Sequence, residues 1–428
     1  MNCLTLACAA ALSATTLFAA PSITGVTMSQ DANSRLVTIS YTLEGTAPAV
    51  VNVSVLSNGV DIGRSALEGA KGTVSGLVQP GKNTITWKPT KSWPGHVFQN
   101  KEISAQVKAW SFSATPDYMI LDLENPSDIR YYEKTEDFPV PLGDDCYRKR
   151  YIVMRKIPAA GIQWRMGSPK AELSGSWYSQ WYSAGGVLHS VFENTRYVTL
   201  TKDFYLGVYE LTDYQYKYVN SGDTTGGVTP SCSASYDTFR GTGKWWPNDG
   251  HDIDSASWLY KLRAKFDNLY SFDLPTEAQW EFACRAGTST ARYDGSNLNP
   301  NGDGITTDSN LDKIAWYGKN AGDGSNNKMR PVGGCYEGET AKLPNGYGLY
   351  DIIGNALEYC LDQWVSTTPY DPSDVIDPKG STTRADTSVV RGGWIWGQQQ
   401  ACRSADRAAR AHNSGGSGYG FRLCVTLP

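Results

Sequence analysis

The sequence predicts an all-β sandwich domain over residues 21–114, followed by a loop-rich globular part that mixes strands and helices. Three observations predict this division. Segments that alternate apolar and polar residues, with turn residues between them, fill the first part, and no helical pattern interrupts them. Helix-capping patterns stand among strand-like segments in the second part. The 428 residues include 43 glycines and 14 tryptophans, a composition that suits long irregular loops.

The first twenty residues carry no charge, and small and apolar residues dominate from Leu4 onward. They end in Leu17-Phe-Ala-Ala-Pro21, which resembles the end of a signal peptide with cleavage near Ala19 or Ala20. An apolar first strand is the alternative, and the Ala-rich, β-poor composition of these residues argues against it. We expect residues 1–20 to be a signal peptide and the protein to be exported, to the periplasm, the cell surface or the medium.

No later run approaches the ~18 apolar residues of a membrane helix, so no transmembrane segment is expected. The formal net charge is −4, and the Lys and Arg residues are scattered along the chain. This charge pattern gives no support to nucleic-acid binding.

Alternating segments justify the predicted sandwich. They are Arg35–Leu43, Val50–Leu56 and Ile103–Trp110, and turn residues such as Ser57-Asn-Gly59 separate them. Short strands at this spacing favour a sandwich of the immunoglobulin or fibronectin type III kind, which most often acts as a spacer or docking unit. Residues 115–150 carry prolines and mixed charges, and we interpret them as a connector.

The second part begins near Tyr151. A strand pair leads into a helix that Thr212 or Asp213 would cap. A second helix is predicted after Leu274, where Thr276 with Gln279 three residues on forms a capping box and Gly287 stops the helix. We expect this second helix to pack Trp280 and Ala283 inward.

Four segments, in this order, resemble the formylglycine-generating enzyme family, also called the sulfatase-modifying-factor family. They are Leu274-Pro-Thr-Glu-Ala-Gln-Trp-Glu-Phe-Ala-Cys-Arg-Ala-Gly-Thr288, Gly346-Tyr-Gly-Leu-Tyr-Asp-Ile-Ile-Gly-Asn-Ala-Leu-Glu-Tyr-Cys360, Val390-Arg-Gly-Gly393 and Gly420-Phe-Arg-Leu423. The resemblance covers residues 151–428 and implies the family's fold, a loop-rich α+β domain of C-type-lectin-like architecture.

The same resemblance raises the question whether this chain has the residues of the family's oxidase reaction. The family's oxidases convert a substrate cysteine to formylglycine with copper(I), which two cysteines five residues apart hold after an Arg-Gly-Gly-Ser turn; soft thiolates suit Cu(I). Registered on Arg391-Gly-Gly393, the first cysteine position is Gly397, the second is Cys402, and the serine is Trp394. The tryptophan usual after Gly-Asn-Ala is Leu357. These departures argue against a copper cofactor and against the oxidase reaction, and they leave Cys402 as the one candidate catalytic residue.

Cys402 has three interpretations. Nine cysteines are present, and removal of a signal peptide would leave seven. Cys360 should neighbour the loop of Cys402 in the family's fold, so a structural Cys360–Cys402 disulfide is the first interpretation. A buried free thiol is the second, and a catalytic or copper-binding thiolate is the third.

The resemblance also implies a calcium site. The family's oxidases bind calcium through the loop that here begins at Asp351. Asp351 and Glu358 would supply side-chain oxygens, and Gly354 and Ala356 would supply backbone carbonyls, a donor set that suits Ca²⁺. The alternative is that both carboxylates only accept hydrogen bonds from neighbouring amides.

Aromatic pairs stand in glycine-rich loops at Trp245-Trp246 and at Trp394 with Trp396. Exposed rings there could form a recognition surface for a peptide or a glycan, whereas buried rings would only stabilise the loops. The sequence therefore predicts an exported, calcium-stabilised ligand-binding member without oxidase activity. A sulfatase-maturing oxidase and a purely structural envelope scaffold are the two alternatives.

Overall fold

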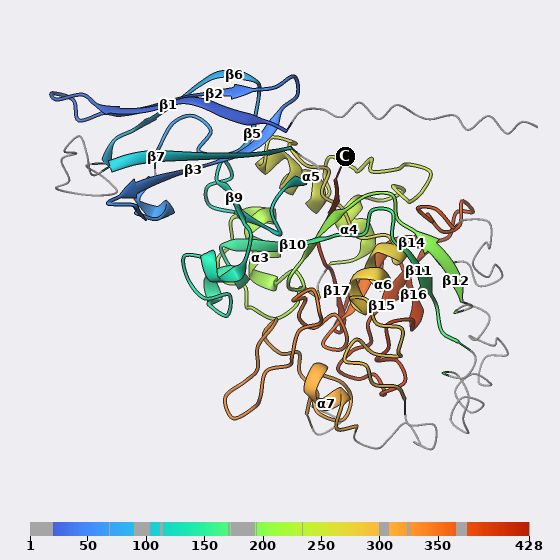
Figure 1. Cartoon of the computed structure of the whole chain (residues 1–428). Coiled ribbons are helices and arrows are strands. Elements are labelled where there is room, and N and C mark those ends of the chain that lie inside the picture. Colours follow the sequence, from blue (N-terminus) through green and yellow to red (C-terminus); the bar gives the residue numbers. More distant parts are fainter. Residues whose placement is uncertain are drawn as a thin grey trace, which may run out of the picture. The chain divides into compact units, whose positions relative to one another are not determined.

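The computed structural model describes residues 20–67, 69–89, 103–111, 114–169, 172, 193, 195–232, 234–298, 308–322, 326–364 and 375–427. It divides the chain into two compact units, Met1–Ser111 and Phe112–Pro428 (Figure 1). The predicted signal peptide lies, except for Ala20, outside the described residues.

Two antiparallel sheets form the first unit. One has the order β1-β2-β6, and in the other β3 lies between β4 and β5 and also pairs with β7. The strands are β1 (Ser22–Gln30), β2 (Val37–Glu44), β3 (Ala49–Ser57), β4 (Val60–Asp61), β5 (Ser75–Val78), β6 (Gly81–Trp87) and β7 (Ile103–Ser111), and the 3₁₀ turn η1 covers Arg64–Leu67.

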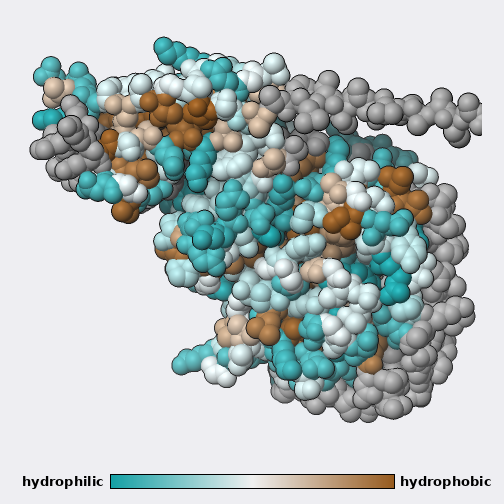
Figure 2. Space-filling model, viewed as in Figure 1, coloured by the Kyte–Doolittle hydropathy of each residue, from teal (hydrophilic) through white to brown (hydrophobic). Residues whose placement is uncertain are grey.

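The alternating residues of these strands form one core. Val37, Ile39 and Tyr41 of β2 are buried in the same cluster as Val51 and Val53 of β3, because every second side chain of a strand faces the same side. Figure 2 shows hydrophobic residues at the surface of this unit between β1 and β7, where the two sheets adjoin. An immunoglobulin or fibronectin type III assignment stays a prediction.

The second unit is built on a five-stranded antiparallel sheet with the order β18-β13-β10-β8-β9. Residues 115–150, interpreted as a connector, supply two of these strands. Met119 and Leu121 of β8 are fully buried, because β8 lies between two other strands inside the sheet. The strands are β8 (Tyr118–Asp122), β9 (Ile129–Tyr132), β10 (Tyr151–Ile157), β13 (Phe204–Gly207) and β18 (Cys424–Thr426).

A second sheet, of order β16-β15-β14-β17, carries the family-like motifs, and β11 pairs with β12. The strands are β11 (Gln163–Met166), β12 (Arg196–Thr199), β14 (Leu357–Gln363), β15 (Thr387–Arg391), β16 (Arg407–Ala411) and β17 (Tyr419–Gly420). The helices are α3 (Asp213–Ser221), α4 (Tyr236–Arg240), α5 (Trp258–Lys265), α6 (Glu277–Arg285) and α7 (Leu311–Ile314), with the 3₁₀ turns η3 (Thr135–Asp137) and η4 (Asp145–Arg148). None of the described helices is both long and apolar enough to span a bilayer.

Both predicted helix starts are confirmed. Thr212 caps α3 and Thr276 caps α6, each in a capping box with the glutamine three residues later. Trp280 is fully buried on α6, as expected. The helix ends before Gly287 as predicted: Ala286 is its C-cap in the left-handed conformation, with φ 45°, and Gly287 follows with φ 89°.

Candidate functional site

The family-like motifs meet in one buried network centred on Glu358. The indole nitrogen of Trp280 donates a hydrogen bond to Glu358 Oε2 at 2.7 Å. The Arg422 guanidinium forms an ion pair with Glu358 Oε1 at 2.6 Å, and it also donates to the carbonyl of Gly207 at 2.9 Å. These groups come from α6, β14 and the segment before β18, so the network joins three distant parts of the chain.

Arg391 makes the second part of this network. It is fully buried and forms ion pairs with Glu281 at 2.6 Å and with Glu277 at 2.9 Å, both on α6. It also donates to the carbonyls of Ser404 and Asp406, each at 3.0 Å. Both ends of the loop 392–406 are therefore fixed to the same helix. Removing one partner of such a buried pair costs about 3–5 kcal/mol, because the other charge stays buried.

The loop 392–406 closes tightly over Cys402. Gly392 and Gly393 have φ values of 100° and 76°, a region that favours glycine. A Cβ at Gly393 would lie 2.8 Å from Cys402 Sγ and 2.8 Å from the carbonyl oxygen of Ala401. The glycine pair thus lets the backbone pass directly over the sulfur.

The side chain of Trp394 occupies the space beside Gly397. A Cβ at Gly397 would lie 2.7 Å from Trp394 Cδ1 and 3.0 Å from the Trp394 carbonyl oxygen. With the indole in this position, a side chain at residue 397 does not fit. The two departures from the oxidase pattern therefore form one structural change, in which the ring of Trp394 fills the place of the side chain absent at residue 397.

Cys402 and Cys360 are buried free thiols, so the structure does not form the predicted disulfide. Both belong to the large hydrophobic cluster of the second unit. Burial raises the pKa of the Cys402 thiol to about 12, and burial raises the pKa of Cys360 well above its ordinary value. Buried apolar packing, rather than a bond between them, accounts for both sulfurs.

These thiols do not fit the copper site of the family's oxidases. Copper(I) prefers two thiolates, whereas the aligned positions here offer one protonated thiol and one glycine. Among the residues that the structure describes, no group of three or more His, Cys, Asp or Glu side chains is arranged to hold a metal ion.

Two tryptophans of the loop 392–406 form an aromatic surface together with Tyr419. Trp394 and Trp396 meet edge to face with ring centroids 5.3 Å apart, and Trp394 is 5.6 Å from the ring of Tyr419. The Arg410 guanidinium lies over Tyr419 at 3.9 Å. Trp396 is 38% exposed, whereas Trp246 of the other predicted pair is buried. We call Trp394, Trp396, Tyr419 and Arg410 the aromatic loop surface.

The predicted calcium loop contains an unpartnered oxygen. Asp351 Oδ2 accepts a hydrogen bond from the backbone of Gly333 at 2.5 Å, but its buried Oδ1 has no hydrogen-bond partner among the described residues. Burial raises the pKa of Asp351 to about 6. Ala356 is buried, and Gly354 packs so closely that a Cβ there would lie 2.5 Å from the carbonyl oxygen of Trp316.

A third acid, Glu210, belongs to this region and has no counterpart among the residues predicted from the sequence. It accepts hydrogen bonds from Asn355 Nδ2 at 2.8 Å and from the Ala356 amide at 3.0 Å. Burial, then the charges of Asp351 and Glu358, raises its pKa well above the ordinary value. Three buried acids thus lie near the Arg422 guanidinium, and Asp351 is also within the field of Arg148.

Comparisons with known proteins identify the family. The family described as "Sulfatase-modifying factor enzyme 1-like domain" matches residues 183–427. The chain is 34% identical over 160 residues to the formylglycine-generating enzyme of Mus musculus, covering 36% of this chain and 38% of that protein. It is 34% identical over 161 residues to the formylglycine-generating enzyme of Thermomonospora curvata, covering 36% of this chain and 49% of that protein.

The chain therefore spans less than half the length of these two curated relatives. Among solved structures, PvdO from Pseudomonas aeruginosa is similar with a TM-score of 0.45 and 18% identity, covering 66% of this chain and 97% of that one.

Proposed function

We propose, from the premise that this chain belongs to the sulfatase-modifying factor enzyme 1-like family, that it is a member without the oxidase reaction. Its function on this proposal is to bind a ligand at the aromatic loop surface. One observation carries the proposal: the Trp394 indole lies 2.7 Å from the Cβ that a side chain at Gly397 would need. The loop that holds two thiolates in the oxidases holds an aromatic ring here.

The aromatic loop surface suits a peptide or a glycan. Trp396 offers a ring that is 38% exposed, and Arg410 adds a cation beside Tyr419. Flat rings pack against sugar faces and peptide backbones, and a guanidinium binds acidic or carbonyl oxygens. Export to the cell envelope is part of the proposal, supported by the apolar first twenty residues.

Calcium is proposed as a structural ion of the same unit. Asp351 Oδ1 supports it as a buried oxygen that lacks a partner among the described residues, and the mutual repulsion of Asp351, Glu210 and Glu358 supports a cation beside them. Asp351 would hold the ion together with the carbonyls of Gly354 and Ala356. Glu358 already binds Arg422 and Trp280, so it would have to share its oxygens between them and the ion.

The alternative function, that of an oxidase, rests on the named relatives. One assay distinguishes it from the proposed function. The purified protein is incubated with a Cys-x-Pro-x-Arg peptide, copper and oxygen, and the peptide is analysed by mass spectrometry. We expect no aldehyde product, because one buried thiol cannot form the two-thiolate copper site. A formylglycine mass that disappears in Cys402→Ser would establish the oxidase function instead.

Ligand binding is tested separately on peptide and glycan arrays. Trp396→Ala should weaken binding strongly, since truncating an exposed anchor ring removes a large part of the contact. Tyr260→Ala is the matched control, because Tyr260 is 44% exposed on α5 and lies outside the aromatic loop surface. Absence of any array signal, or equal loss in both variants, would favour the purely structural scaffold.

A further inference from the structure

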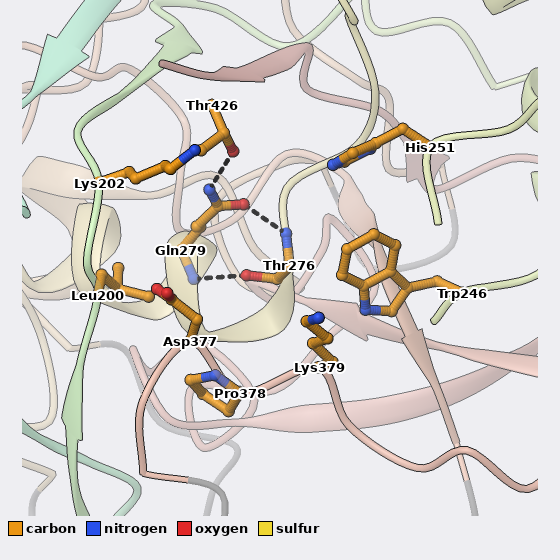
Figure 3. Close-up of a pocket in the computed structure, with 10 residues that line it drawn as sticks. All are labelled: Leu200, Lys202, Trp246, His251, Thr276, Gln279, Asp377, Pro378, Lys379 and Thr426. Carbon is orange, nitrogen blue, oxygen red and sulfur yellow. Dashed lines mark hydrogen bonds between the residues drawn. The ribbon is translucent and has the colours of Figure 1, made fainter. Parts of the chain in front are cut away.

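A pocket of about 130 Å³ opens beside the first turn of α6 and shares no residue with the aromatic loop surface. Figure 3 shows Leu200 and Lys202 on one side of it and Trp246 and His251 on the opposite side, with the start of α6 between them. The remaining lining residues are Thr276, Gln279, Asp377, Pro378, Lys379 and Thr426.

Trp246 brings an unsatisfied donor to this pocket. The residue is only 7% exposed, and its buried indole nitrogen has no hydrogen-bond partner among the described residues. In Figure 3 this nitrogen is directed toward Lys379. A buried N–H without an acceptor is costly, so an acceptor placed between the indole and the Lys379 ammonium would satisfy a group that the fold leaves unpaired.

His251 is held in a fixed orientation at the same wall. Its Nδ1 lies 2.9 Å from Asp273 Oδ2, and its ring centroid lies 5.0 Å from that of Trp246. Burial alone would raise the pKa of Asp273, but the charge of Arg240 and the bond to His251 hold it below its ordinary value. Asp273 is therefore an anion that accepts the Nδ1 proton, and Nε2 is left as the other polar atom of the ring.

The charges around the pocket favour an anion. Lys202 and Lys379 are cations, and Asp377 is the carboxylate among the lining residues that the structure describes. Asp377 is already engaged, because its Oδ1 accepts from the Thr201 amide at 2.8 Å and its Oδ2 accepts from the Thr201 hydroxyl.

The polar groups at the floor of the pocket have hydrogen-bond partners within the protein. Gln279 donates to the Thr426 hydroxyl at 2.8 Å and accepts from the Thr276 amide at 2.9 Å (Figure 3). With the floor satisfied, the buried polar group of the lining that has no partner among the described residues is the Trp246 indole N–H.

We propose that this pocket binds a small organic anion. Its carboxylate or phosphate group lies between the Lys379 ammonium and the Trp246 indole N–H, with Lys202 adding positive potential (Figure 3). Its apolar part lies against Trp246 and Leu200. A closed cavity of about 150 Å³ accommodates benzene, so this open pocket of about 130 Å³ takes the head group and part of a ring, and the rest of the ligand lies at its mouth. This site is independent of the ligand surface proposed above.

Isothermal titration of the full-length protein tests the site with three probes: benzoate, inorganic phosphate and the neutral isostere benzamide. We expect an anion to bind with a dissociation constant of about 1 mM, a value within reach of so small a ligand. Benzamide should bind at least about tenfold more weakly. The stronger of the two anions identifies the head group as carboxylate or phosphate.

Variants locate the site. Lys202→Gln with Lys379→Gln should weaken anion binding about tenfold or more, and Trp246→Phe, which keeps a ring but removes the donor, should weaken it about fivefold to tenfold. Lys313→Gln, on α7 outside the pocket, should bind as the unaltered protein does. Each variant is used only if its melting curve shows a folded protein. Absence of binding by both anions, equal binding of benzamide, or unchanged binding in the folded pocket variants would overturn the proposal.

Discussion

The indole of Trp394 and a side chain at residue 397 would compete for the same space. The ring of Trp394 lies 2.7 Å from the place of a Cβ at residue 397, and a Cβ at Gly418 would lie 2.2 Å from the same ring. A tryptophan without the glycine, or a cysteine without the loss of the tryptophan, would overfill the loop. Overfilling a packed site costs about 1–3 kcal/mol.

A double-mutant cycle measures this coupling. Gly397→Cys alone should lower the free energy of unfolding by about 1–3 kcal/mol, because the new side chain collides with the indole. In the Trp394→Ser background the same substitution should cost at least about 1 kcal/mol less, since the colliding ring is gone. Urea unfolding of the four proteins gives the answer. Additive effects would show that the two positions do not share space.

Cys402 should be chemically inert in the folded protein. Burial raises the pKa of its thiol to about 12, so almost none is thiolate at pH 8. We expect iodoacetamide to label Cys402 only after unfolding, with the half-buried Cys335 as the internal control for access. Mass spectrometry of peptides after brief labelling measures both. Fast native labelling of Cys402 would indicate an accessible thiolate and would revive its catalytic interpretation.

At the scale of elements, α6 was predictable and its partners were not. Local rules place its start at Thr276, since a capping box needs only residues three positions apart. Glu210 and Arg422 join the same network from distant segments, and no local pattern marks a carboxylate that will be buried beside another. The left-handed end at Ala286 was likewise missed, because glycine is the usual residue for that conformation.

Asp362 of β14, whose carboxylate contacts the start of α6, predicts a pH dependence of stability. Its carboxylate accepts the Glu277 amide at 2.6 Å, while burial and the charge of Glu277 raise its pKa to about 7. Arg407 and Arg196 lower it in part. A raised acid pKa means that the folded state binds the proton more tightly, so this contribution to stability is present below about pH 4 and is lost as the pH rises through 7.

Asp362→Asn should therefore flatten the stability profile between about pH 4 and pH 7, since an amide keeps the acceptor for Glu277 but has no proton to lose. The free energy of unfolding of the variant minus that of the unaltered protein should therefore be larger at pH 8 than at pH 5. Urea unfolding at these two values, with Asp267→Asn on the exposed turn after α5 as control, provides the measurement. A variant whose difference from the unaltered protein is the same at both values would refute the assignment.

For the whole molecule, periodicity predicted the first unit better than the second. Alternation over residues 35–43 reappears as the buried side of β2, because a two-sided strand shows its period in its sequence. The strand β8 was hidden inside the predicted connector, since a strand buried on both faces has no alternation and the prolines and charges around it resemble a linker. Pockets formed by several loops, such as that of Trp246 and His251, have no signal in a single segment.

Calcium should stabilise the molecule if Asp351 and its neighbours hold it. Ligand binding to the folded state adds about 2.7 kcal/mol when the free ion exceeds its dissociation constant a hundredfold, so chelation should lower the melting temperature by several degrees and added Ca²⁺ should restore it. Asp351→Asn should remove most of this response. A melting curve that is the same in chelator and in Ca²⁺, starting from metal-free protein, would exclude the site.

The order of the five-stranded sheet has a consequence for biosynthesis. The strand β18 adds to β13 at one edge of that sheet, although the α6 helix, the buried ion network and the loop over Cys402 all lie between them in the chain. A ribosome must therefore deliver residues 424–426 before this sheet can be completed. Contacts between such distant segments form slowly, so the emerging chain stays open for much of its synthesis. On the export proposed above, late closure of the sheet would keep the chain in the open form that a translocation machinery threads.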